Sequence, residues 1–167
     1  REDGSECRPR EEGEITVRGP NVMLGYWRDP ERTRETLREG WLWTGDLGFV
    51  DEDGYLFLTD RKGDMIISGG ENVHPTETEN TLQEHPAVRE VAVIGLPDPK
   101  WGEAVKAVVA LEPGGAASED ELIAFCKERI AGYKCPRSID FAPELPKSTV
   151  GKILRKDVKK WYSESES

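Results

Sequence analysis

Asp46, Arg61 and Lys152 are three of the charged residues in this 167-residue sequence whose side chains, a carboxylate, a guanidinium and an ammonium, suit the binding of hydroxyl groups or phosphates. A carboxylate can accept two parallel O–H bonds, and an arginine fork can contact two oxygens at once. Taken singly, each residue also has a purely structural interpretation. Asp46 could belong to a turn, Arg61 could pair with Asp60 or Asp64, and Lys152 could point into solvent. The choice depends on the segments that surround them.

The central segment, residues 59–75, runs from a charged turn through an apolar strand to a glycine pair and a proline. Residues 65–67 (Met-Ile-Ile) are expected to form a buried strand. Gly69 and Gly70 permit positive φ angles and a close approach of backbone or ligand. Pro75 can open a helix. By itself this pattern predicts only a strand, a tight turn and the start of a helix.

Three further motifs accompany this segment in a fixed order. They are Gly-Trp-Leu-Trp-Thr-Gly-Asp at residues 40–46, Tyr-Lys-Cys-Pro at 133–136 and Leu-Pro-Lys-Ser-Thr-Val-Gly-Lys at 145–152. Together the four segments resemble the C-terminal third of the adenylate-forming enzymes, specifically the AMP-forming acyl-CoA synthetases of the fatty-acid–CoA ligase type. The resemblance extends from residue 13 to residue 160, which is nearly the whole chain.

In that family, ATP activates a carboxylic acid as an acyl-adenylate with release of pyrophosphate, and the acyl group is then transferred to the thiol of CoA. The resemblance therefore implies ATP, CoA and a carboxylic acid, in the first place a fatty acid, as ligands. The family's phosphate-holding loop, its Mg²⁺ site and most of its acyl pocket belong to the N-terminal part that precedes these segments. We therefore expect a piece of a larger enzyme that is inactive when isolated.

The resemblance also implies a division of the chain. Residues 1–60 would be the incomplete C-terminal end of the large N-terminal, AMP-binding domain, residues 61–63 a hinge, residues 64–162 the mobile C-terminal domain and residues 163–167 a disordered tail. Gly63 stands where the family usually has Lys or Asp at its hinge, so only backbone freedom can be carried over to this position. The alternative is a glycine that simply suits the turn before Met65.

The same resemblance assigns roles to individual residues. Lys152 would be the catalytic residue, with its ammonium on the charge that develops at the α-phosphate. Asp46 would accept hydrogen bonds from the ribose hydroxyls of ATP, and Arg61 would lie near the ribose and phosphate. Four residues resemble the segment that lines the pantetheine tunnel of CoA: Ser68, Gly69, Gly70 and Glu71. Lys127 and Lys134 could meet the CoA phosphates or could be ordinary surface lysines.

The net charge of −10 argues against nucleic acid as a partner, because duplex binding usually needs a basic face. Basic residues concentrate at 147–160, where six Lys or Arg accompany one Asp; apart from Lys152, we expect a solvated basic helix there. No apolar run approaches the roughly 20 residues that span a bilayer. We expect a cytoplasmic protein without a transmembrane segment, whose partners are its ligands and its own N-terminal domain.

The Cys and His residues show no pattern of a metal site or a disulfide framework. Cys7, Cys126 and Cys135 are an odd number without CxxC spacing. His74 and His85 lack metal-ligand spacing, and no Ser or Cys nucleophile motif accompanies them. We therefore expect no metal ligands in this chain and structural roles for both histidines.

The hydrophobic pattern predicts an α+β fold in two parts. Before the hinge we expect mostly antiparallel β structure with a poor core: a strand at 14–18, a short helix between Pro30 and Gly40, and a hairpin of residues 47–50 and 55–59. After the hinge we expect a short sheet with helices on one side. Its helices are expected at 75–84, after the capping box of residues 118–121, and at 153–162; its strands are expected at 88–95, 104–111 and 138–142.

Two alternatives stay open. An adenylation domain that loads a carrier protein belongs to the same superfamily, although Ile-Ser-Gly-Gly-Glu-Asn-Val at residues 67–73 is more similar to the acyl-CoA synthetases. A detached, non-catalytic binding domain belongs to a different class. The upstream sequence distinguishes them, because a phosphate-holding loop there favours the enzyme. Acyl chain length is not predicted, since the acyl pocket lies elsewhere.

Overall fold

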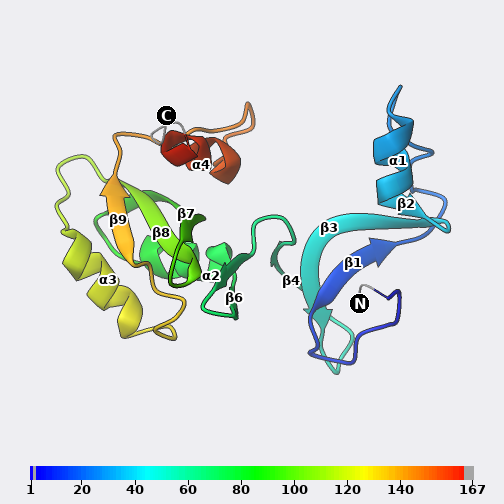
Figure 1. The fold of residues 1–167 in the computed structure, drawn as a ribbon, viewed down its shortest axis with the longest axis horizontal. Coiled ribbons are helices and arrows are strands. Elements are labelled where there is room, and N and C mark those ends of the chain that lie inside the picture. The colour runs from blue at the N-terminus through cyan, green and yellow to red at the C-terminus, as the bar shows by residue number, and fades with distance from the viewer. Residues whose placement is uncertain (2, 164–167) are drawn as a thin grey trace. The chain divides into compact units, whose positions relative to one another are not determined.

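The computed structural model describes residues 1 and 3–163, and the chain divides into two compact units, Arg1–Gly63 and Asp64–Ser167 (Figure 1). The boundary between the units falls directly after Gly63. Ser163, which we expected in a disordered tail, is the last residue of a helix. The rest of the expected tail, residues 164–167, lies outside the described residues.

The first unit contains a four-stranded antiparallel sheet. Its strands are β1 (Gly13–Val17), β2 (Leu37–Arg38), β3 (Trp41–Val50) and β4 (Leu56–Arg61). The long strand β3 pairs with each of the other three. The predicted turn between β3 and β4 is confirmed: the Asp51 carboxylate accepts hydrogen bonds from the N–H groups of Asp53 at 3.0 Å and Tyr55 at 2.9 Å.

Helix α1 (Pro30–Thr36) begins as predicted and ends earlier than predicted. Asp29 caps it by accepting a hydrogen bond from the Arg32 N–H at 3.0 Å, and the proline occupies the first helical position. Gly40 does not end the helix. Instead, Glu39 and Gly40, with φ angles of 51° and 82°, turn the chain from β2 into β3.

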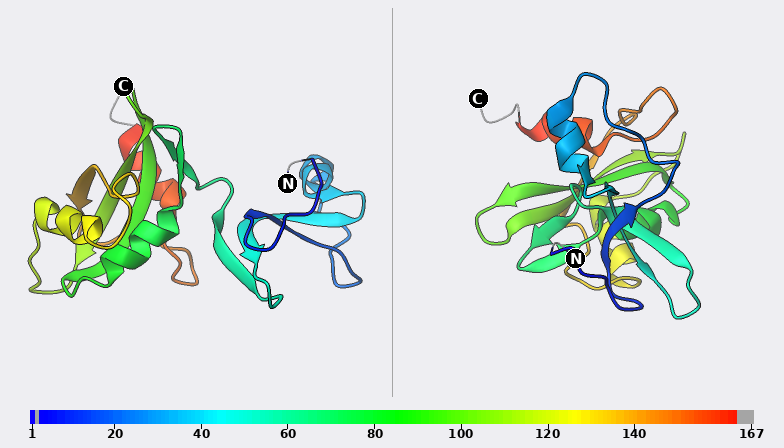
Figure 2. Two further views of the ribbon diagram at one scale, coloured as in Figure 1. Left: turned by 90° about the horizontal axis from the view of Figure 1, so that it is seen from below. Right: turned by 90° about the vertical axis from the view of Figure 1, so that its right-hand side faces the viewer.

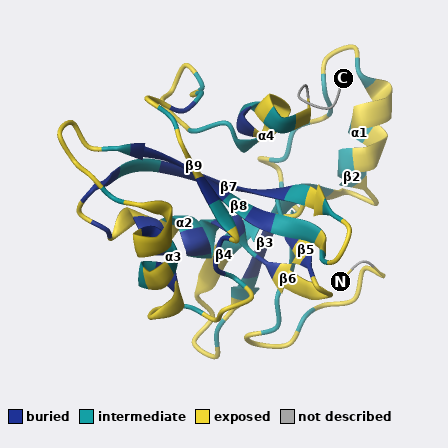
Figure 3. Cartoon of the chain, turned by 60° about the vertical axis from the view of Figure 1, so that its left-hand side comes forward, coloured by how far each residue is buried: buried dark blue, intermediate teal, exposed yellow. Residues whose placement is uncertain are grey.

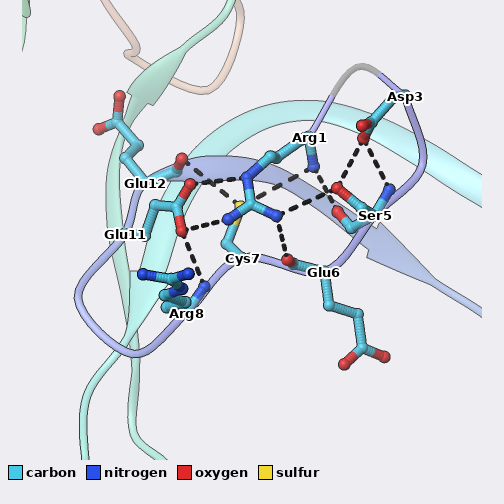
Figure 4. Close-up of polar contacts among 8 residues, drawn as sticks. All are labelled: Arg1, Asp3, Ser5, Glu6, Cys7, Arg8, Glu11 and Glu12. Atoms are coloured by element: carbon cyan, nitrogen blue, oxygen red, sulfur yellow. Dashed lines mark hydrogen bonds and ion pairs between the residues drawn. The ribbon is translucent and has the colours of Figure 1, made fainter.

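The N-terminal segment before β1 has no helix or strand in its described residues and is organised around Arg1 (Figure 4). The Arg1 guanidinium donates to the two carboxylate oxygens of Glu11 at 2.7 and 2.6 Å, and to Ser5 Oγ at 3.1 Å. The contact with Arg1 lowers the pKa of the Glu11 carboxyl. Because both partners are exposed to solvent, this contact shapes a surface loop and adds no core.

The first unit has a poor core, as expected. In its described part, Leu47 is the only buried apolar side chain. By contrast, Leu24, Trp27 and Leu58 are 101%, 86% and 71% exposed. The first unit therefore leaves large apolar side chains exposed, both in the connection after β1 and on β4.

The second unit contains a five-stranded sheet. Its strands are β5 (Ile66–Ser68), β6 (Glu71–Val73), β7 (Val88–Asp98), β8 (Gly102–Leu111) and β9 (Ser138–Phe141). The β7–β8 hairpin is antiparallel, whereas β9 runs parallel to β8. Strand β7 continues through Leu96 and Pro97 to Asp98, beyond residue 95, where we expected it to end. Figure 3 shows that buried residues concentrate in β7 and β8.

Helices cover both faces of this sheet (Figure 2). They are α2 (Pro75–Gln83), α3 (Glu119–Lys127) and α4 (Arg155–Ser163). Val93 packs into the cluster that contains Leu82 of α2 and Leu122 of α3, whereas its neighbour Ile94 packs with Val158 of α4. Successive strand residues point to opposite faces, so both faces of β7 are buried. Our expectation of helices on one side is therefore wrong, and the prediction of an α+β fold is confirmed.

The local helix signals agree with the structure at two of the three helices. Ser118 and Glu121 form the predicted capping box of α3. Helix α2 begins at Pro75, as predicted. Helix α4 begins at Arg155 and not at Ile153, because Ile153 forms an isolated antiparallel bridge with Lys147. No helix in the described part of the chain is long and apolar enough to cross a membrane.

Candidate functional site

The two candidate residues of the first unit lie side by side on neighbouring strands. Asp46 of β3 and Arg61 of β4 are register partners, and Arg61 Nε donates to Asp46 Oδ1 at 3.2 Å. Their side chains are 38% and 63% exposed, respectively. A carboxylate and a guanidinium that are held together and still reach solvent can bind a ligand that carries both hydroxyl groups and anionic oxygens.

Glu14 supports this pair from the adjacent strand β1. Its side chain is only 11% exposed. One carboxylate oxygen accepts the N–H of Gly45 at 3.1 Å, and the other accepts Lys62 Nζ at 3.3 Å. Glu14 thus fixes the residue before Asp46 and the residue after Arg61. Sequence reasoning missed this role, because only the pairing of β1 with β3 brings Glu14 to residues that are 31 and 48 positions away.

Lys152 lies in the second unit, in the loop that precedes α4, which we call the Lys152 loop (residues 147–153). Ser148 N donates to the Lys152 carbonyl at 2.8 Å, and Lys152 N donates to Ser148 Oγ at 3.1 Å. Gly151 has a φ of 80° and donates to the Ser148 carbonyl at 2.9 Å. Lys152 is exposed, so the tight turn presents its ammonium to solvent.

Glu90 of β7 holds the base of this loop. Its side chain is 13% exposed; Oε1 accepts Lys147 Nζ at 2.7 Å and Oε2 accepts the Leu145 N–H at 3.2 Å. The hydrogen bond from Lys147 is the largest of the effects that lower the pKa of the Glu90 carboxyl. Strand β7, which pairs with β8 at the edge of the sheet, therefore determines where the Lys152 loop begins.

The four residues expected at the pantetheine of CoA form the hairpin between β5 and β6. Ser68 and Glu71 are register partners, and Gly69 and Gly70 have φ angles of 63° and 86°. Positive φ at both central residues is the geometry of a type I′ turn. The glycine pair therefore joins two strands. Strand β6, with only three residues, was not predicted.

The strand before this turn is buried on one side only. Ile66 and Ser68 are buried, whereas Ile67 is 53% exposed, so the expectation of a buried strand at residues 65–67 is wrong for Ile67. The Ile67 N–H donates to the Glu103 carboxylate of β8 at 3.0 Å. Residues 69–71 of the hairpin are exposed and face solvent.

Gly69 lies against the ring of Trp101. Its N–H donates to the Trp101 carbonyl at 2.8 Å, and a Cβ at this position would lie 2.9 Å from Trp101 Cε3. The guanidinium carbon of Arg137 lies 3.9 Å from the centroid of the Trp101 ring. Both the positive φ and this close contact favour glycine at position 69.

The two lysines considered for the CoA phosphates differ in their surroundings. Lys134 is 21% exposed, and its Nζ donates to both carboxylate oxygens of Glu77 at 2.8 and 2.6 Å. Lys127 is exposed at the end of α3. Burial raises the pKa of the Cys135 thiol, and the charge of Lys127 opposes this effect. Lys134 would have to exchange Glu77 for a ligand phosphate.

Two further titratable residues of the second unit, His85 and Cys126, have structural surroundings. His85 is buried, accepts the Ala87 N–H at 3.3 Å through Nδ1 and meets the edge of Phe125 at 5.0 Å between ring centroids. Burial raises the pKa of the Cys126 thiol to about 12, which keeps it protonated. No group of three or more His, Cys, Asp and Glu that could hold a metal ion occurs among residues 1 and 3–163.

Comparison with known proteins agrees with this arrangement. Residues 77–152 match the AMP-binding enzyme C-terminal domain. A long-chain-fatty-acid–CoA ligase of Bacillus subtilis (strain 168) is 52% identical over 155 residues, covering 93% of this chain and 28% of the ligase. A feruloyl-CoA synthase of an Amycolatopsis species is 52% identical over 159 residues, covering 95% of this chain and 32% of the synthase.

Solved structures give the same result. The o-succinylbenzoate CoA synthetase of Bacillus subtilis, in complex with its acyl-adenylate intermediate, matches with a TM-score of 0.88 and 44% identity. The match covers 94% of this chain and 32% of the synthetase. The same synthetase has been solved in complex with ATP and a magnesium ion; that structure matches with a TM-score of 0.87 and 43% identity over 94% of this chain and 32% of the synthetase.

The α+β fold matches that of the C-terminal parts of adenylate-forming enzymes. The chain belongs to the adenylate-forming superfamily and corresponds to the C-terminal portion of its AMP-forming acyl-CoA ligases. The resemblance seen in the four sequence motifs is thereby confirmed. The chain spans about a third of the length of these relatives.

Proposed function

We propose that this chain is the C-terminal part of an ATP-dependent acyl-CoA synthetase that activates a carboxylic acid as an acyl-adenylate and transfers the acyl group to CoA. The relatives named above act on a fatty acid, a ferulic acid and a succinylbenzoate, so the class of reaction is common to them and the acid is not. A fatty acid is our first candidate, because a long-chain-fatty-acid–CoA ligase is among the relatives that are 52% identical to this chain. The net charge of −10 supports small-molecule substrates over nucleic acid, and we place the enzyme in the cytoplasm.

The observation that carries the proposal is the contact between Asp46 and Arg61. The ribose of ATP offers a vicinal diol, whose two O–H groups a carboxylate can accept in parallel. Arg61 lies 3.2 Å from this carboxylate and its fork keeps further N–H groups for the ribose and phosphate oxygens. The ion pair favours side-chain orientations in which the carboxylate and the guanidinium lie together at the same place on the sheet.

Lys152 would act in the first half-reaction. Attack of the substrate carboxylate on the α-phosphate builds up negative charge on the phosphate oxygens as pyrophosphate leaves. An ammonium held at these oxygens stabilises the transition state more than the bound ATP. The exposed position of Lys152 at the end of a tight turn suits insertion into a site completed by another part of the enzyme.

The second half-reaction would use the β5–β6 hairpin. The exposed glycines of the turn leave room for the thin pantetheine arm of CoA beside Ser68 and Glu71. Lys127 and Lys134 would offer positive charge to the CoA phosphates. For Mg²⁺, we propose that residues outside this chain hold the ion, in the N-terminal part that the family resemblance implies.

The proposal is tested with an intact ligase that contains residues 1–167, by ATP–pyrophosphate exchange with a panel of carboxylic acids. Asp46→Ala should reduce kcat/KM for ATP roughly 10- to 100-fold, because charge-assisted hydrogen bonds contribute about 1.5–3 kcal/mol. Asp53→Ala, an exposed aspartate in the turn of the same hairpin, is the matched control and should leave the exchange unchanged. Residues 1–167 alone should give only background.

Two results would contradict the proposal. One is an intact protein that exchanges pyrophosphate with none of the acids. The other is an Asp46→Ala variant that behaves like Asp53→Ala, which would make Asp46 an ordinary strand residue.

A further inference from the structure

Arg155, three residues after Lys152, points into the second unit and not into solvent. Its side chain is only 19% exposed, so the expectation of a solvated basic helix is wrong for this residue. Its guanidinium donates to Glu79 through Nε at 2.7 Å and through Nη2 at 2.5 Å. Nη1 donates to Asp64 Oδ2 at 2.9 Å, and Nη2 also reaches Thr76 Oγ1 at 2.8 Å.

Glu79 connects this arginine to the sheet of the second unit. Its side chain is 15% exposed, and Oε1 accepts both Arg155 Nε at 2.7 Å and the Val93 N–H of β7 at 2.8 Å. A bidentate arginine–carboxylate pair fixes direction as well as distance. Glu79 is bonded at the same time to a buried strand. It therefore fixes the position of the first turn of α4 relative to β7.

Asp64 connects the same arginine to the beginning of the second unit. It is the first residue after the boundary at Gly63 and lies 91 positions before Arg155 in the sequence. One guanidinium thus joins the end of the Lys152 loop, the sheet of the second unit and the residue that follows the expected hinge. No local sequence pattern brings these three points together.

We propose that Arg155, held between Asp64 and Glu79, is a positioning residue that fixes the Lys152 loop to the first residue of the second unit. When the unit turns about the hinge, Lys152 then moves with it as part of one rigid body. This inference rests on the proposed function, in which Lys152 must enter and leave the adenylation site. A lysine at 155 would keep the charge but could not reach acceptors in three directions with a planar fork.

The first measurement is hydrogen–deuterium exchange of the intact ligase and of its Arg155→Lys and Glu79→Gln variants. The amides of Gly151, Lys152 and Leu154 are bonded within the loop or to its base and report its order. Their exchange should accelerate about tenfold or more in both variants, because local opening becomes easier. Amides of α3 should keep their wild-type rates.

The matched control is Glu119→Gln. Glu119 on α3 accepts the Ile139 N–H of β9 at 2.9 Å, which is the same kind of helix-to-strand contact that Glu79 makes with Val93. This hydrogen bond joins α3 to β9 and includes no atom of the Lys152 loop. Glu119→Gln should therefore leave the exchange of the loop amides at the wild-type rate.

The second measurement separates the two half-reactions. In Arg155→Lys, kcat for acyl-adenylate formation should fall by up to about 10²-fold, since a misplacement of about 1 Å has effects of this size. The KM for ATP and the transfer of a supplied acyl-adenylate to CoA should change little. Unchanged exchange of the loop amides would overturn the inference whatever the activity. Equal losses in both half-reactions, in step with the melting temperature, would also overturn it.

The proposed function and this inference are tested by different measurements, so one can fail while the other holds. A wild-type ligase that forms no acyl-adenylate would sink the proposed reaction. The exchange rates of the Lys152 loop would then still show whether Arg155 positions it.

Discussion

The residues next to Lys152 in the chain determine its backbone conformation and leave its side chain exposed. Gly151 has a φ of 80°, and a Cβ at this position would meet no atom within 4 Å. Glycine is therefore favoured at position 151 by the backbone conformation and not by a lack of space. A residue with a Cβ is destabilised by roughly 1 kcal/mol or more in this left-handed region of φ and ψ. Ser148 adds hydrogen bonds through both its backbone and its hydroxyl group. Together they hold the backbone of Lys152 while its side chain stays free to reach a ligand.

At the residue scale, Lys152→Ala in the intact ligase should damage adenylation far more than thioester formation from a supplied acyl-adenylate. Removing a stabilising charge from a preorganised site lowers the rate roughly 10²–10³-fold, equivalent to about 3–4 kcal/mol. Lys156→Ala removes an exposed lysine of α4 and is the matched control, with both half-reactions expected near wild type. Equal loss in both half-reactions of Lys152→Ala would contradict the assigned role.

At the scale of the elements, β7 supports the Lys152 loop through Glu90. The hydrogen bond from Lys147 is the main cause of the lowered pKa of this carboxyl. The folded state therefore favours the ionised form, and the unfolded state binds a proton more readily. The stabilisation is fully present above the usual pKa of 4.5 and is lost as the pH falls through the lowered value.

Glu90→Gln should lower the free energy of unfolding by about 1–2 kcal/mol near pH 7, because the variant lacks the hydrogen-bonded charge pair with Lys147. The difference from wild type should shrink as the pH falls below 4.5. Chemical denaturation across this pH range measures it. Glu84→Gln, at an exposed position at the end of α2, should show no such pH dependence. A difference that persists unchanged at acidic pH would mean that the side chain acts by packing and not by charge.

At the scale of the whole molecule, Gly63 stands at the boundary of two units that each have their own sheet. Its φ is not in the positive range, and a Cβ would meet no atom within 4 Å. The observed conformation would therefore accept other residues. Glycine gives this position access to further conformations, which favours the hinge proposal over a turn that requires glycine.

Gly63→Pro should leave one half-reaction nearly intact and suppress the other, because proline fixes φ near −65° and locks the orientation compatible with it. Both half-reactions are measured in the intact ligase, with Gly63→Ala as the control that fits the observed backbone. If both reactions survive at wild-type rates, the pivot lies elsewhere. If both fall together with the melting temperature, Gly63 is only a turn residue.

Features that depend on neighbouring residues could be predicted from the sequence. Asp29 caps α1, Ser118 starts the capping box of α3, and Asp51 organises the turn between β3 and β4, because each of these contacts spans four residues or fewer. The α+β class followed from the hydrophobic pattern, and the family followed from the resemblance of four motifs that occur in a fixed order. The candidate residues of those motifs were also found in this way, since residue type and local sequence identify them.

Only the tertiary structure decided which of these residues meet. Arg61 contacts Asp46 from 15 positions away, and Arg155 contacts Asp64 from 91 positions away, so no local pattern indicates either pair. One signal was available for Arg155, because it lies on the same face of α4 as the buried Val158, three residues later. Helix α4 has the sequence of a basic, solvated helix, yet the sheet has two apolar faces, and covering the second one turns Val158 and the stem of Arg155 inward.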